Sequence, residues 1–407
     1  MILIECFTES HIDNMASCLR LRPEVMILVG DMLQMGKPMK RYEQILRLRK
    51  QSTKIRPCDI HKKDFTEIYN ALAQIVAQDE EYIIDMTGGD ETVIMAVGAL
   101  IAGLGEEKRQ HVHVQTYDHQ KGMVYDNIHD NLSYPSGDVS LTVEQLILLH
   151  GGKLHPEAYQ PGAECRINAM ADLWQIVTED PKQWNRSVTL LNEFESRSGL
   201  GMEICLHLGQ IRDGISKFEE KLPVVQALLK KMEKNGVIDI VSWEGTLEYT
   251  YRSSLLRYCM LKAGNVLEVK TLLEGRGVLK NGKPYFCDNR MSVNIDWDGV
   301  VHEPEEHIPE TRNEIDVVLM RGLTPLFISC KNGNIGEEEL YKLNTVASRF
   351  GGPYARKMLI ATDLDRKSVA ADRSFIQRAW DMDIFLVPDG AALLPAEWRD
   401  IFKQVMQ

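Results

Sequence analysis

Residues 313–331 read NEIDVVLMRGLTPLFISCK, and this stretch decides the fold that the sequence predicts for the C-terminal part of the chain. Its two apolar runs, 313–320 and 325–331, are typical of strands. The turn from Arg321 to Pro325 would join them as a hairpin. Asp316 lies on the first strand and Lys331 ends the second, so we expect the two side chains near the same end of one sheet.

A carboxylate beside a lysine suits phosphodiester hydrolysis. Asp316 is the candidate to hold a divalent cation through oxygen, and such a cation polarises a phosphate and lowers the pKa of an attacking water. Lys331 would position that water or stabilise charge in the transition state. Glu268, in the helix before the hairpin, would approach the metal from the other side. Glu314 shares a strand face with Asp316 and would add a ligand or accept a proton.

The rest of the C-terminal part fits an α/β sheet around this hairpin. Patterns predict helices at 253–273, 336–349 and 369–381, and further strands at 291–298, 356–362 and 383–388. The resulting order is α-β-β-β-α-β-α-β. We therefore assign residues 251–407 to one α/β domain.

The N-terminal part alternates strands and helices. Apolar runs at 1–7, 24–30, 81–86 and 111–117 predict buried strands, with helices at 12–21, 39–50, 64–78 and 91–104 between them. This alternation is typical of an open, mostly parallel sheet, which binds ligands beyond the carboxyl ends of its strands. A polar stretch at 121–140 marks the boundary of a first domain, residues 1–140.

Residues 141–250 are expected to be mainly helical. At their end, a helix, a turn at Asn235–Gly236 and two alternating strands resemble a winged-helix unit. We interpret residues 141–250 as a linker domain that separates the two ends of the chain.

Two polar loops of the N-terminal sheet are candidates for ligand binding. One follows the third predicted strand and begins Thr87-Gly88-Gly89 before a helix. Its glycines allow close approach of the backbone, and the helix N-terminus favours phosphate. It lacks the Gly-Lys-Ser/Thr ending of a P-loop. The other loop, Thr8 to His11, follows the first strand, and in an open sheet the two loops can border one crevice.

Composition limits the classes of function. The net charge of −12 argues against a general nucleic-acid coat protein, although a local basic groove remains compatible with it. No apolar run approaches the roughly 18 residues of a membrane span. None of the eight cysteines forms a CxxC pair, so a zinc ribbon is not expected, and their scatter suits a reduced, cytoplasmic environment.

The C-terminal constellation resembles the PD-(D/E)xK nuclease superfamily, whose domain is restriction-endonuclease-like. Glu268 matches the acid of the first helix, Asp316 the acid of the first strand, and Lys331 the lysine. The sequence departs from the motif at Ser329, where the family has Asp or Glu, and it reads Ser329-Cys330-Lys331. Three interpretations follow: Ser329 ligates weakly or through water, an acid from Glu337, Glu338 or Glu339 replaces it, or the site is inactive. The backbone carbonyl of Cys330 remains a possible metal ligand.

The N-terminal loops resemble the CARF domain of type III CRISPR systems, a Rossmann-like sensor of cyclic oligoadenylates. By this resemblance the ligand-binding residues are Thr8, Glu9, Ser10, His11, Met86, Thr87, Gly88, Gly89, Asp90 and Glu91. Asp90 and Glu91 stand where the family often has Thr-Lys. The loss of that lysine removes a cation that would meet phosphate, and Lys37, Lys40 and Arg41 are candidates to supply it.

A CARF domain, a winged-helix-like linker and a PD-(D/E)xK domain together resemble the single-CARF CRISPR ancillary nucleases. The resemblance implies a homodimer activated by cyclic tetra-adenylate, with Mn²⁺ or Mg²⁺ as cofactor and DNA or RNA as substrate. Ligand binding would rotate the nuclease domains and shape a cleft between them.

Three alternatives remain from the sequence. One is a ligand-responsive CARF and winged-helix transcription regulator with a degenerate nuclease domain. A nucleotide-dependent dehydrogenase or transferase is less consistent, since G-x-G-x-x-G is missing after the first strand. The third is a catalytically inactive binding module, which Ser329 keeps open.

Overall fold

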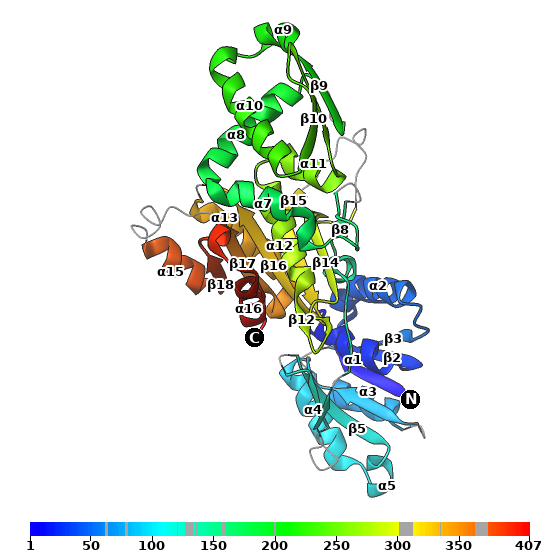
Figure 1. Cartoon of the computed structure of the whole chain (residues 1–407). Coiled ribbons are helices and arrows are strands. Elements are labelled where there is room, and N and C mark those ends of the chain that lie inside the picture. The colour runs from blue at the N-terminus through cyan, green and yellow to red at the C-terminus, as the bar shows by residue number, and fades with distance from the viewer. Residues whose placement is uncertain are drawn as a thin grey trace.

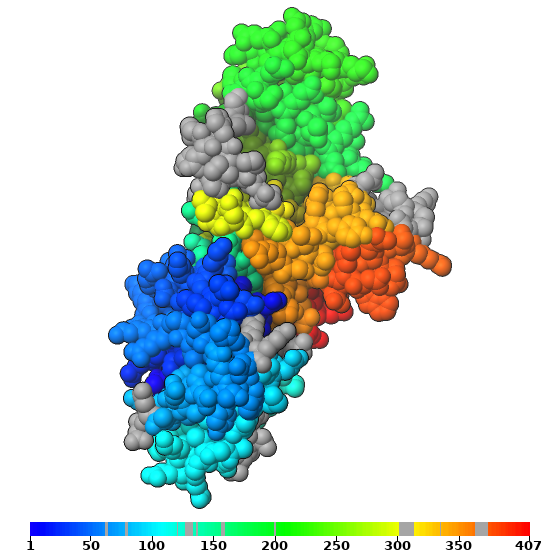
Figure 2. Space-filling view, turned by 180° about the vertical axis from the view of Figure 1, so that it is seen from behind, coloured from blue at the N-terminus to red at the C-terminus, as the bar shows by residue number. Residues whose placement is uncertain are grey.

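The chain forms three parts stacked along one long axis (Figures 1 and 2). The computed structural model describes residues 1–61, 64–77, 80–119, 121–126, 133–135, 137–155, 159–198, 201–300, 312–333, 335–362 and 373–407. Within the predicted boundary at 121–140, residues 127–132 and 136 lie outside the described residues. The fold is α/β, as the sequence predicts.

The lower part in Figure 1 is built on a seven-stranded sheet in the order β3-β2-β1-β4-β5-β6-β7, with β3 to β5 parallel and β6 and β7 antiparallel. Its strands are β1 (Ile2–Cys6), β2 (Val25–Gly30), β3 (Lys54–Asp59), β4 (Tyr82–Asp85), β5 (Val112–Asp118), β6 (Met123–Asp126) and β7 (Ser133–Pro135), and its helices are α1 (Asp13–Leu21), α2 (Met32–Leu48), α3 (Phe65–Ile75), α4 (Glu91–Gly103) and α5 (Glu106–Arg109). Leu3 of β1 packs in a core with α1 and α2, whereas Ile4 packs in a core with α3 and α4. The helices therefore cover both faces, as expected for a parallel sheet.

Three details of this part differ from the sequence prediction. The stretch at 121–140, predicted as a polar boundary, carries the strands β6 and β7, which extend the sheet. The helix predicted at 39–50 begins at Met32, because Asp31 accepts a hydrogen bond from the backbone N–H of Leu33 (2.8 Å) and caps it. The sequence pattern also missed β3, whose side chains are mostly exposed and so lack an apolar run.

The middle part is a six-stranded sheet in the order β18-β17-β16-β15-β14-β8. Its strands are β8 (Lys153–Leu154), β14 (Asp288–Asp296), β15 (Arg312–Arg321), β16 (Thr324–Lys331), β17 (Arg356–Ala361) and β18 (Ile384–Val387), and around it lie α6 (Val143–Leu149), α12 (Asn265–Gly277), the hairpin β12 (Leu279–Lys280) and β13 (Lys283–Pro284), α13 (Glu337–Gly351), η4 (Gly352–Tyr354), α15 (Arg373–Asp381), η5 (Gly390–Ala392) and α16 (Pro395–Val405). β14, β15 and β16 are antiparallel, and β16, β17 and β18 are parallel. The first residues of the helix predicted at 369–381, 369–372, lie outside the described residues.

Two cores cover the two faces of this sheet. Leu326 and Ile328 of β16 pack with α12 and α16, whereas Phe327 packs with α13. The core on the α13 side continues through α6 into the face of the lower sheet that carries α1 and α2. The lower and middle parts are therefore joined by one continuous apolar core.

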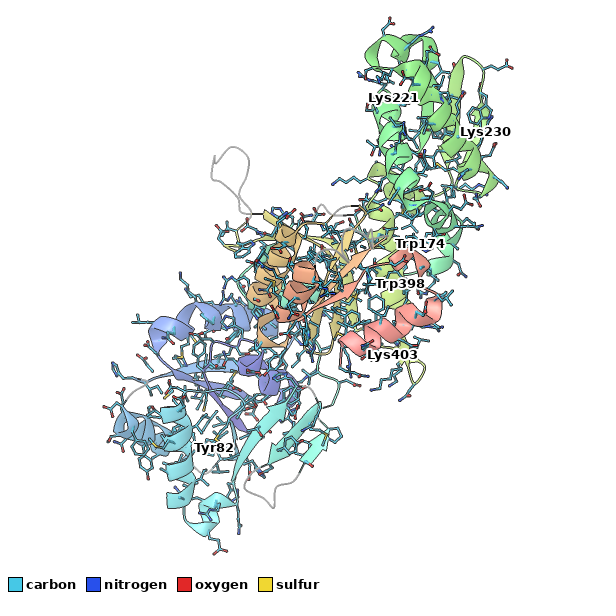
Figure 3. The ribbon with its side chains drawn as sticks, turned by 90° about the vertical axis from the view of Figure 1, so that its left-hand side faces the viewer. Tyr82, Trp174, Lys221, Lys230, Trp398 and Lys403 are labelled. Atoms are coloured by element: carbon cyan, nitrogen blue, oxygen red, sulfur yellow. The ribbon has the colours of Figure 1, made fainter. Side chains whose placement is uncertain are left out.

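The upper part contains η1 (Ile167–Met170), α7 (Ala171–Glu179), α8 (Pro181–Glu195), β9 (Glu203–His207), α9 (Leu208–Ile211), η2 (Arg212–Gly214), α10 (Phe218–Lys234), β10 (Ile238–Ser242), β11 (Thr246–Tyr251) and α11 (Ser254–Leu261). The predicted helix, turn and two strands are α10, β10 and β11, and β9 pairs with β11 as a third strand. Trp174 of α7 and Trp398 of α16 lie near one another and belong to one buried core (Figure 3), so the upper part packs on the middle part.

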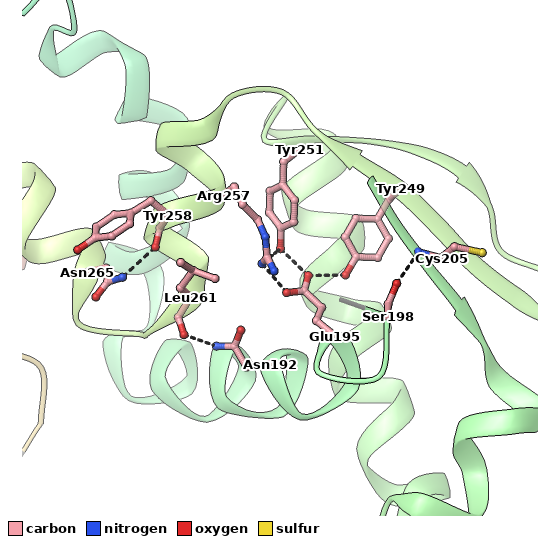
Figure 4. A network of polar contacts seen from close by, with 10 residues as sticks. All are labelled: Asn192, Glu195, Ser198, Cys205, Tyr249, Tyr251, Arg257, Tyr258, Leu261 and Asn265. Atoms are coloured by element: carbon pink, nitrogen blue, oxygen red, sulfur yellow. Dashed lines mark hydrogen bonds and ion pairs between the residues drawn. The ribbon is translucent and has the colours of Figure 1, made fainter. Parts of the chain in front are cut away.

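A buried polar cluster holds α8, β11 and α11 together (Figure 4). Glu195 accepts hydrogen bonds from the hydroxyls of Tyr249 and Tyr251, each at 2.6 Å, and its second oxygen pairs with Arg257 at 2.5 Å. All four residues are buried. Since α11 leads directly into α12, this cluster fixes the start of the segment that carries Glu268.

The single helix predicted at 253–273 is wrong, because the segment forms two helices, α11 and α12. The carbonyl of Ala263 accepts hydrogen bonds from the side chains of Trp184 (3.0 Å) and Asn332 (3.1 Å). The side-chain amide of Asn265 donates to the carbonyl of Tyr258 at 2.9 Å. These side chains hold the chain at the break between the helices, and the break places Glu268 in the first turn of α12.

No helix among the described residues is long and apolar enough to cross a membrane.

Candidate functional site

The predicted hairpin of β15 and β16 opens into a fork at Asp316. The two strands pair from Arg321 and Thr324 as far as Val317 and Ile328, whereas the pairing of β16 with β17 runs from Leu326 on to Lys331. Asp316 enters this fork: its Oδ2 accepts hydrogen bonds from the backbone N–H of Cys330 (2.6 Å) and from the hydroxyl of Ser329 (3.2 Å). Asp316 thus lies against the Ser329-Cys330-Lys331 segment, as the sequence predicts.

Lys331 is held between two carboxylates. Its Nζ lies 3.7 Å from Oδ2 of Asp316 and 2.9 Å from Oε2 of Glu339, in the first turn of α13. Although burial works to lower the pKa of Lys331, the charges of Asp316 and Glu339 raise it above its usual range. Lys331 is therefore a fixed cation, and it is 29% exposed, so it is accessible from the solvent.

Among the three acids considered as replacements for Ser329, Glu339 is the one that lines the site. Glu337 pairs with Arg378 at 3.1 Å, and the carboxylate of Glu338 folds back over Gly336. Glu339 itself is engaged by Lys331 and by Lys342, both at 2.9 Å.

Glu268 approaches from the opposite side of the sheet. Its Oε2 accepts a hydrogen bond from the hydroxyl of Ser292 (3.4 Å), which also lies 2.9 Å from the hydroxyl of Tyr258. Burial, followed by the negative charges of Asp316 and Glu314, raises the pKa of Glu268 to about 8. Burial likewise raises the pKa of Asp316, against the opposing effect of Lys331. The two carboxyl groups are close enough to repel each other when both are ionised.

A cavity of about 310 Å³ opens over the fork. It is lined by Asn313, Glu314, Ile315, Asp316, Ser329, Lys331, Glu339, Lys342, Leu343 and Val346. Glu314 is exposed at its rim. The side chain of Cys330 is buried, with Sγ 3.5 Å from Oγ1 of Thr271, so Cys330 can offer only its backbone to this cavity.

The donor set at the fork fits a small, hard divalent cation. Within the described residues, no group of three or more His, Cys, Asp or Glu side chains is arranged to hold a metal ion. Glu268 and Asp316 remain a pair of mutually repelling carboxylates, and a cation between them would relieve that repulsion. One or two carboxylates with several waters are the usual environment of Mg²⁺.

The two predicted ligand loops meet at the carboxyl end of the lower sheet, because β1 and β4 are neighbours. A Cβ atom on Gly88 would overlap the side chain of Thr8, and a Cβ on Gly89 would lie 2.9 Å from Cβ of Cys6. Gly89 also adopts a positive φ of 110°, a conformation that favours glycine. Glycine is therefore required at both positions for the loops to touch.

Thr87 fastens the turn after β4. Its hydroxyl donates to Oδ1 of Asp85 (2.5 Å) and accepts from the backbone N–H of Tyr117 (2.8 Å), at the end of β5. Asp90 caps α4 by accepting from the N–H of Thr92 at 3.1 Å. The side chains of Thr87 and Asp90 are therefore used within the turn, and a ligand would contact mainly its backbone and glycines.

The loop after β1 is fastened by residues that the sequence analysis missed. Asn14 accepts from the N–H of Thr8 (2.9 Å) and donates to its carbonyl (2.7 Å). The sequence prediction also missed Asp85, which accepts the hydrogen bond from Thr87. A charged residue at the end of the apolar strand Tyr82–Asp85 could have indicated it. Glu9 is exposed, whereas the hydroxyl of Ser10 is buried and has no partner among the described residues.

His11 points away from this loop, toward the junction with the middle part. Its Nδ1 lies 2.8 Å from the hydroxyl of Tyr42 and its Nε2 lies 3.3 Å from Arg41, and its ring makes an edge contact with His150. Burial, then the charges of His150, Arg41 and Arg349, lowers the pKa of His11 to about 3. Arg41 therefore faces His11, whereas Lys37 and Lys40 are exposed on α2.

Among the solved structures of similar fold are the following three. The protein VC1899 of Vibrio cholerae has a TM-score of 0.73 and 17% identity over 100% of this chain and 97% of that one. Can2 of Sulfobacillus thermosulfidooxidans, solved in complex with cyclic tetra-adenylate, has a TM-score of 0.64 and 16% identity over 100% and 97%. A type III CRISPR defence DNA nuclease activated by cyclic oligoadenylate has a TM-score of 0.51 and 14% identity, over 89% of this chain and 45% of that one.

At these identities the likeness establishes a shared fold across the whole chain. No protein-family model and no curated protein matches the sequence.

Proposed function

We propose that this chain is a metal-dependent endonuclease, activated by cyclic tetra-adenylate, that cleaves DNA, RNA or both in type III CRISPR defence. In this proposal the predicted domain of residues 1–140 senses the ligand, and that of residues 251–407 forms the nuclease. The predicted linker, residues 141–250, also contributes β8 to the nuclease sheet and packs α6 against it. The observation that carries the proposal is the fork, where the carboxylate of Asp316 and the ammonium of Lys331 lie 3.7 Å apart at the mouth of a cavity. The likeness to Can2, solved with cyclic tetra-adenylate, supports the choice of activator.

In the proposed nuclease site, Asp316, Glu268 and the carbonyl of Cys330 would hold Mn²⁺ or Mg²⁺. A bound ion would supply Lewis-acid polarisation of the phosphate and an activated water. Lys331 contributes a fixed positive charge, which stabilises negative charge that develops on the phosphate. Glu339 orients Lys331, and Ser329 orients Asp316 through its hydroxyl. Glu314, at the rim, is placed to accept a proton.

In the proposed sensor, the backbone of residues 86–91 and the loop of residues 8–10 contact the ligand, whereas His11 faces the junction with the middle part. Two copies of the chain would place two such loop pairs around one two-fold axis. An isologous dimer suits a ring with its own two-fold symmetry, because each half of the ligand meets identical groups. Met32, Leu33, Ile94 and Met95 are exposed apolar side chains at the starts of α2 and α4, beside this edge of the sheet, and would pack in that interface.

A second candidate function is a cyclic oligoadenylate-responsive regulator with an inactive nuclease domain. Two observations favour it: Ser329 stands where the superfamily has an acid, and the described residues hold no cluster of three metal-ligating side chains. Under this alternative the upper part would carry the regulatory activity, and the fork would have no catalytic role.

One assay separates the two. The purified full-length protein is incubated with Mn²⁺ or Mg²⁺ and with cyclic tri-, tetra- or hexa-adenylate, against supercoiled plasmid and single-stranded RNA. We expect cleavage that needs both metal and cyclic tetra-adenylate. Binding of cyclic tetra-adenylate without cleavage of either substrate would support the regulator, and absence of both would overturn the proposal.

A further inference from the structure

A buried polar junction joins the lower part, which contains the proposed sensor, to the middle part at Asp13. Oδ1 of Asp13 accepts a hydrogen bond from the hydroxyl of Tyr354 at 2.8 Å and lies 2.6 Å from Nε2 of His119. The side chains of His119 and Asp13 are only 2% and 9% exposed. The rings of His119 and Tyr354 are 4.1 Å apart. The hydrogen bond from Tyr354 is costly to remove, because its loss leaves a buried acceptor unsatisfied.

Asp13 is connected to the loop after β1. It is the first residue of α1, and its neighbour Asn14 bonds both the N–H and the carbonyl of Thr8. Thr8 in turn packs against Gly88. A ligand that moves the contact between Thr8 and Gly88 therefore moves the start of α1.

Asp13 is also connected to the turn after β4, by a separate route. The hydroxyl of Thr87 accepts from the backbone N–H of Tyr117 at 2.8 Å. The ring of Tyr117 makes an edge contact with His119, with centroids 4.3 Å apart. Both proposed ligand loops thus converge on the same carboxylate.

On the other side, Tyr354 is tied to the fork through α13. It lies in η4, which directly follows α13, and a Cβ on Gly351 at the end of that helix would lie 2.7 Å from the ring of Phe327 in β16. The first turn of the same helix carries Glu339, which holds Lys331 at the far end of β16. With a rise of about 1.5 Å per residue, α13 is a rigid element of roughly 22 Å that spans from the junction to the fork.

We propose that Asp13 and Tyr354 couple the ligand loops to the nuclease site: ligand at the two loops shifts their contact, and α13 transmits the shift to Glu339 and so to Lys331. This inference rests on the proposed function and adds its regulation. The helix is held at its C-terminal end by the contact of Tyr354 with Asp13, and at its N-terminal end by that of Glu339 with Lys331. A shift of the helix at one end therefore changes the contact at the other.

The test compares Tyr354→Phe with Tyr341→Phe in the full-length protein. Tyr341 lies on α13 but is 44% exposed and contacts Arg378 at the surface. Three quantities are measured: affinity for cyclic tetra-adenylate by calorimetry, and cleavage rates with and without ligand. For Tyr354→Phe we expect affinity within about threefold of wild type, an unchanged basal rate and a loss of about tenfold in ligand stimulation. Tyr341→Phe should match wild type in all three.

Hydrogen exchange of residues 337–351 supplies a readout that does not depend on cleavage. Ligand should change the exchange of this helix in wild type and in Tyr341→Phe, and leave it unchanged in Tyr354→Phe and Asp13→Asn. Full stimulation of Tyr354→Phe, or no ligand response of α13 in wild type, would overturn the inference. So would parallel loss of affinity and stimulation, since the residues would then only shape the pocket. If wild type neither binds nor responds to ligand, the proposed function itself fails.

Discussion

The ammonium of Lys331 lies 2.9 Å from the carboxylate of Glu339, so the lysine at the end of β16 is positioned by the helix that follows it. The PD-(D/E)xK motif, which this sequence resembles, has its second acid two residues before the lysine, on the same strand. Here that position is Ser329, which donates to Asp316 instead. The acid nearest to Lys331 therefore comes from α13, at 2.9 Å against 3.7 Å for Asp316, so the position of Lys331 depends on that helix.

Lys331→Met should reduce cleavage by about 10² to 10³, because it removes a fixed charge aimed at the reacting phosphate, and it should leave ligand affinity unchanged. Lys342→Met is the matched control, since Lys342 pairs with the same Glu339 at the same distance of 2.9 Å but is 66% exposed. Cleavage rates under single-turnover conditions measure the effect. Wild-type activity of Lys331→Met would show that Lys331 has no part in the reaction.

Much of the fork was predictable from the sequence, because Asp316 and Lys331 stand at the ends of two strongly apolar runs, which fix strand and register. The break between α11 and α12 was not, because it depends on Trp184 and Asn332, which are distant in sequence from Ala263. Nor was the junction at Asp13: its partner Tyr354 is 341 residues away, and no local pattern reports such a contact.

Gly88→Ala should separate the two ligand loops. The added Cβ overlaps Thr8, and the backbone must move to accommodate it, so affinity for cyclic tetra-adenylate should fall by at least about tenfold, or about 1.4 kcal/mol. Gly105→Ala is the control, since a Cβ there meets no atom within 4 Å. Calorimetric titration gives both affinities, and undiminished binding by Gly88→Ala would place the ligand elsewhere.

Stability should fall in acid because of His11. Burial, then the charges of His150, Arg41 and Arg349, lowers the pKa of His11 in the folded state to about 3, below its ordinary value of 6.5. The unfolded state therefore binds more protons between these values, and the free energy of unfolding decreases as pH falls from 6.5 toward 3. At pH 5 the contribution is at most about 2 kcal/mol.

Denaturant titrations of wild type and His11→Gln at pH 7 and pH 5 measure this contribution. The variant lacks the titrating ring and should lose less stability between the two pH values. His207→Gln, at an exposed position in the upper part, should follow wild type. Identical pH dependence for wild type and His11→Gln would mean that His11 is protonated at its ordinary pKa.

Glu195→Gln should destabilise the protein by about 3 kcal/mol, since it leaves Arg257 buried without its counter-charge. Glu193→Gln, two residues earlier on α8, provides the comparison: Glu193 pairs with Lys221 but is 35% exposed, so its loss should cost less than about 1 kcal/mol. Because α11 carries Arg257 and leads into α12, the substitution should also displace Glu268. Urea titration gives the stability, and metal-dependent cleavage of the folded variant gives the second effect. If Glu195→Gln lowers stability and leaves cleavage at the wild-type rate, the cluster holds the upper part together without positioning Glu268.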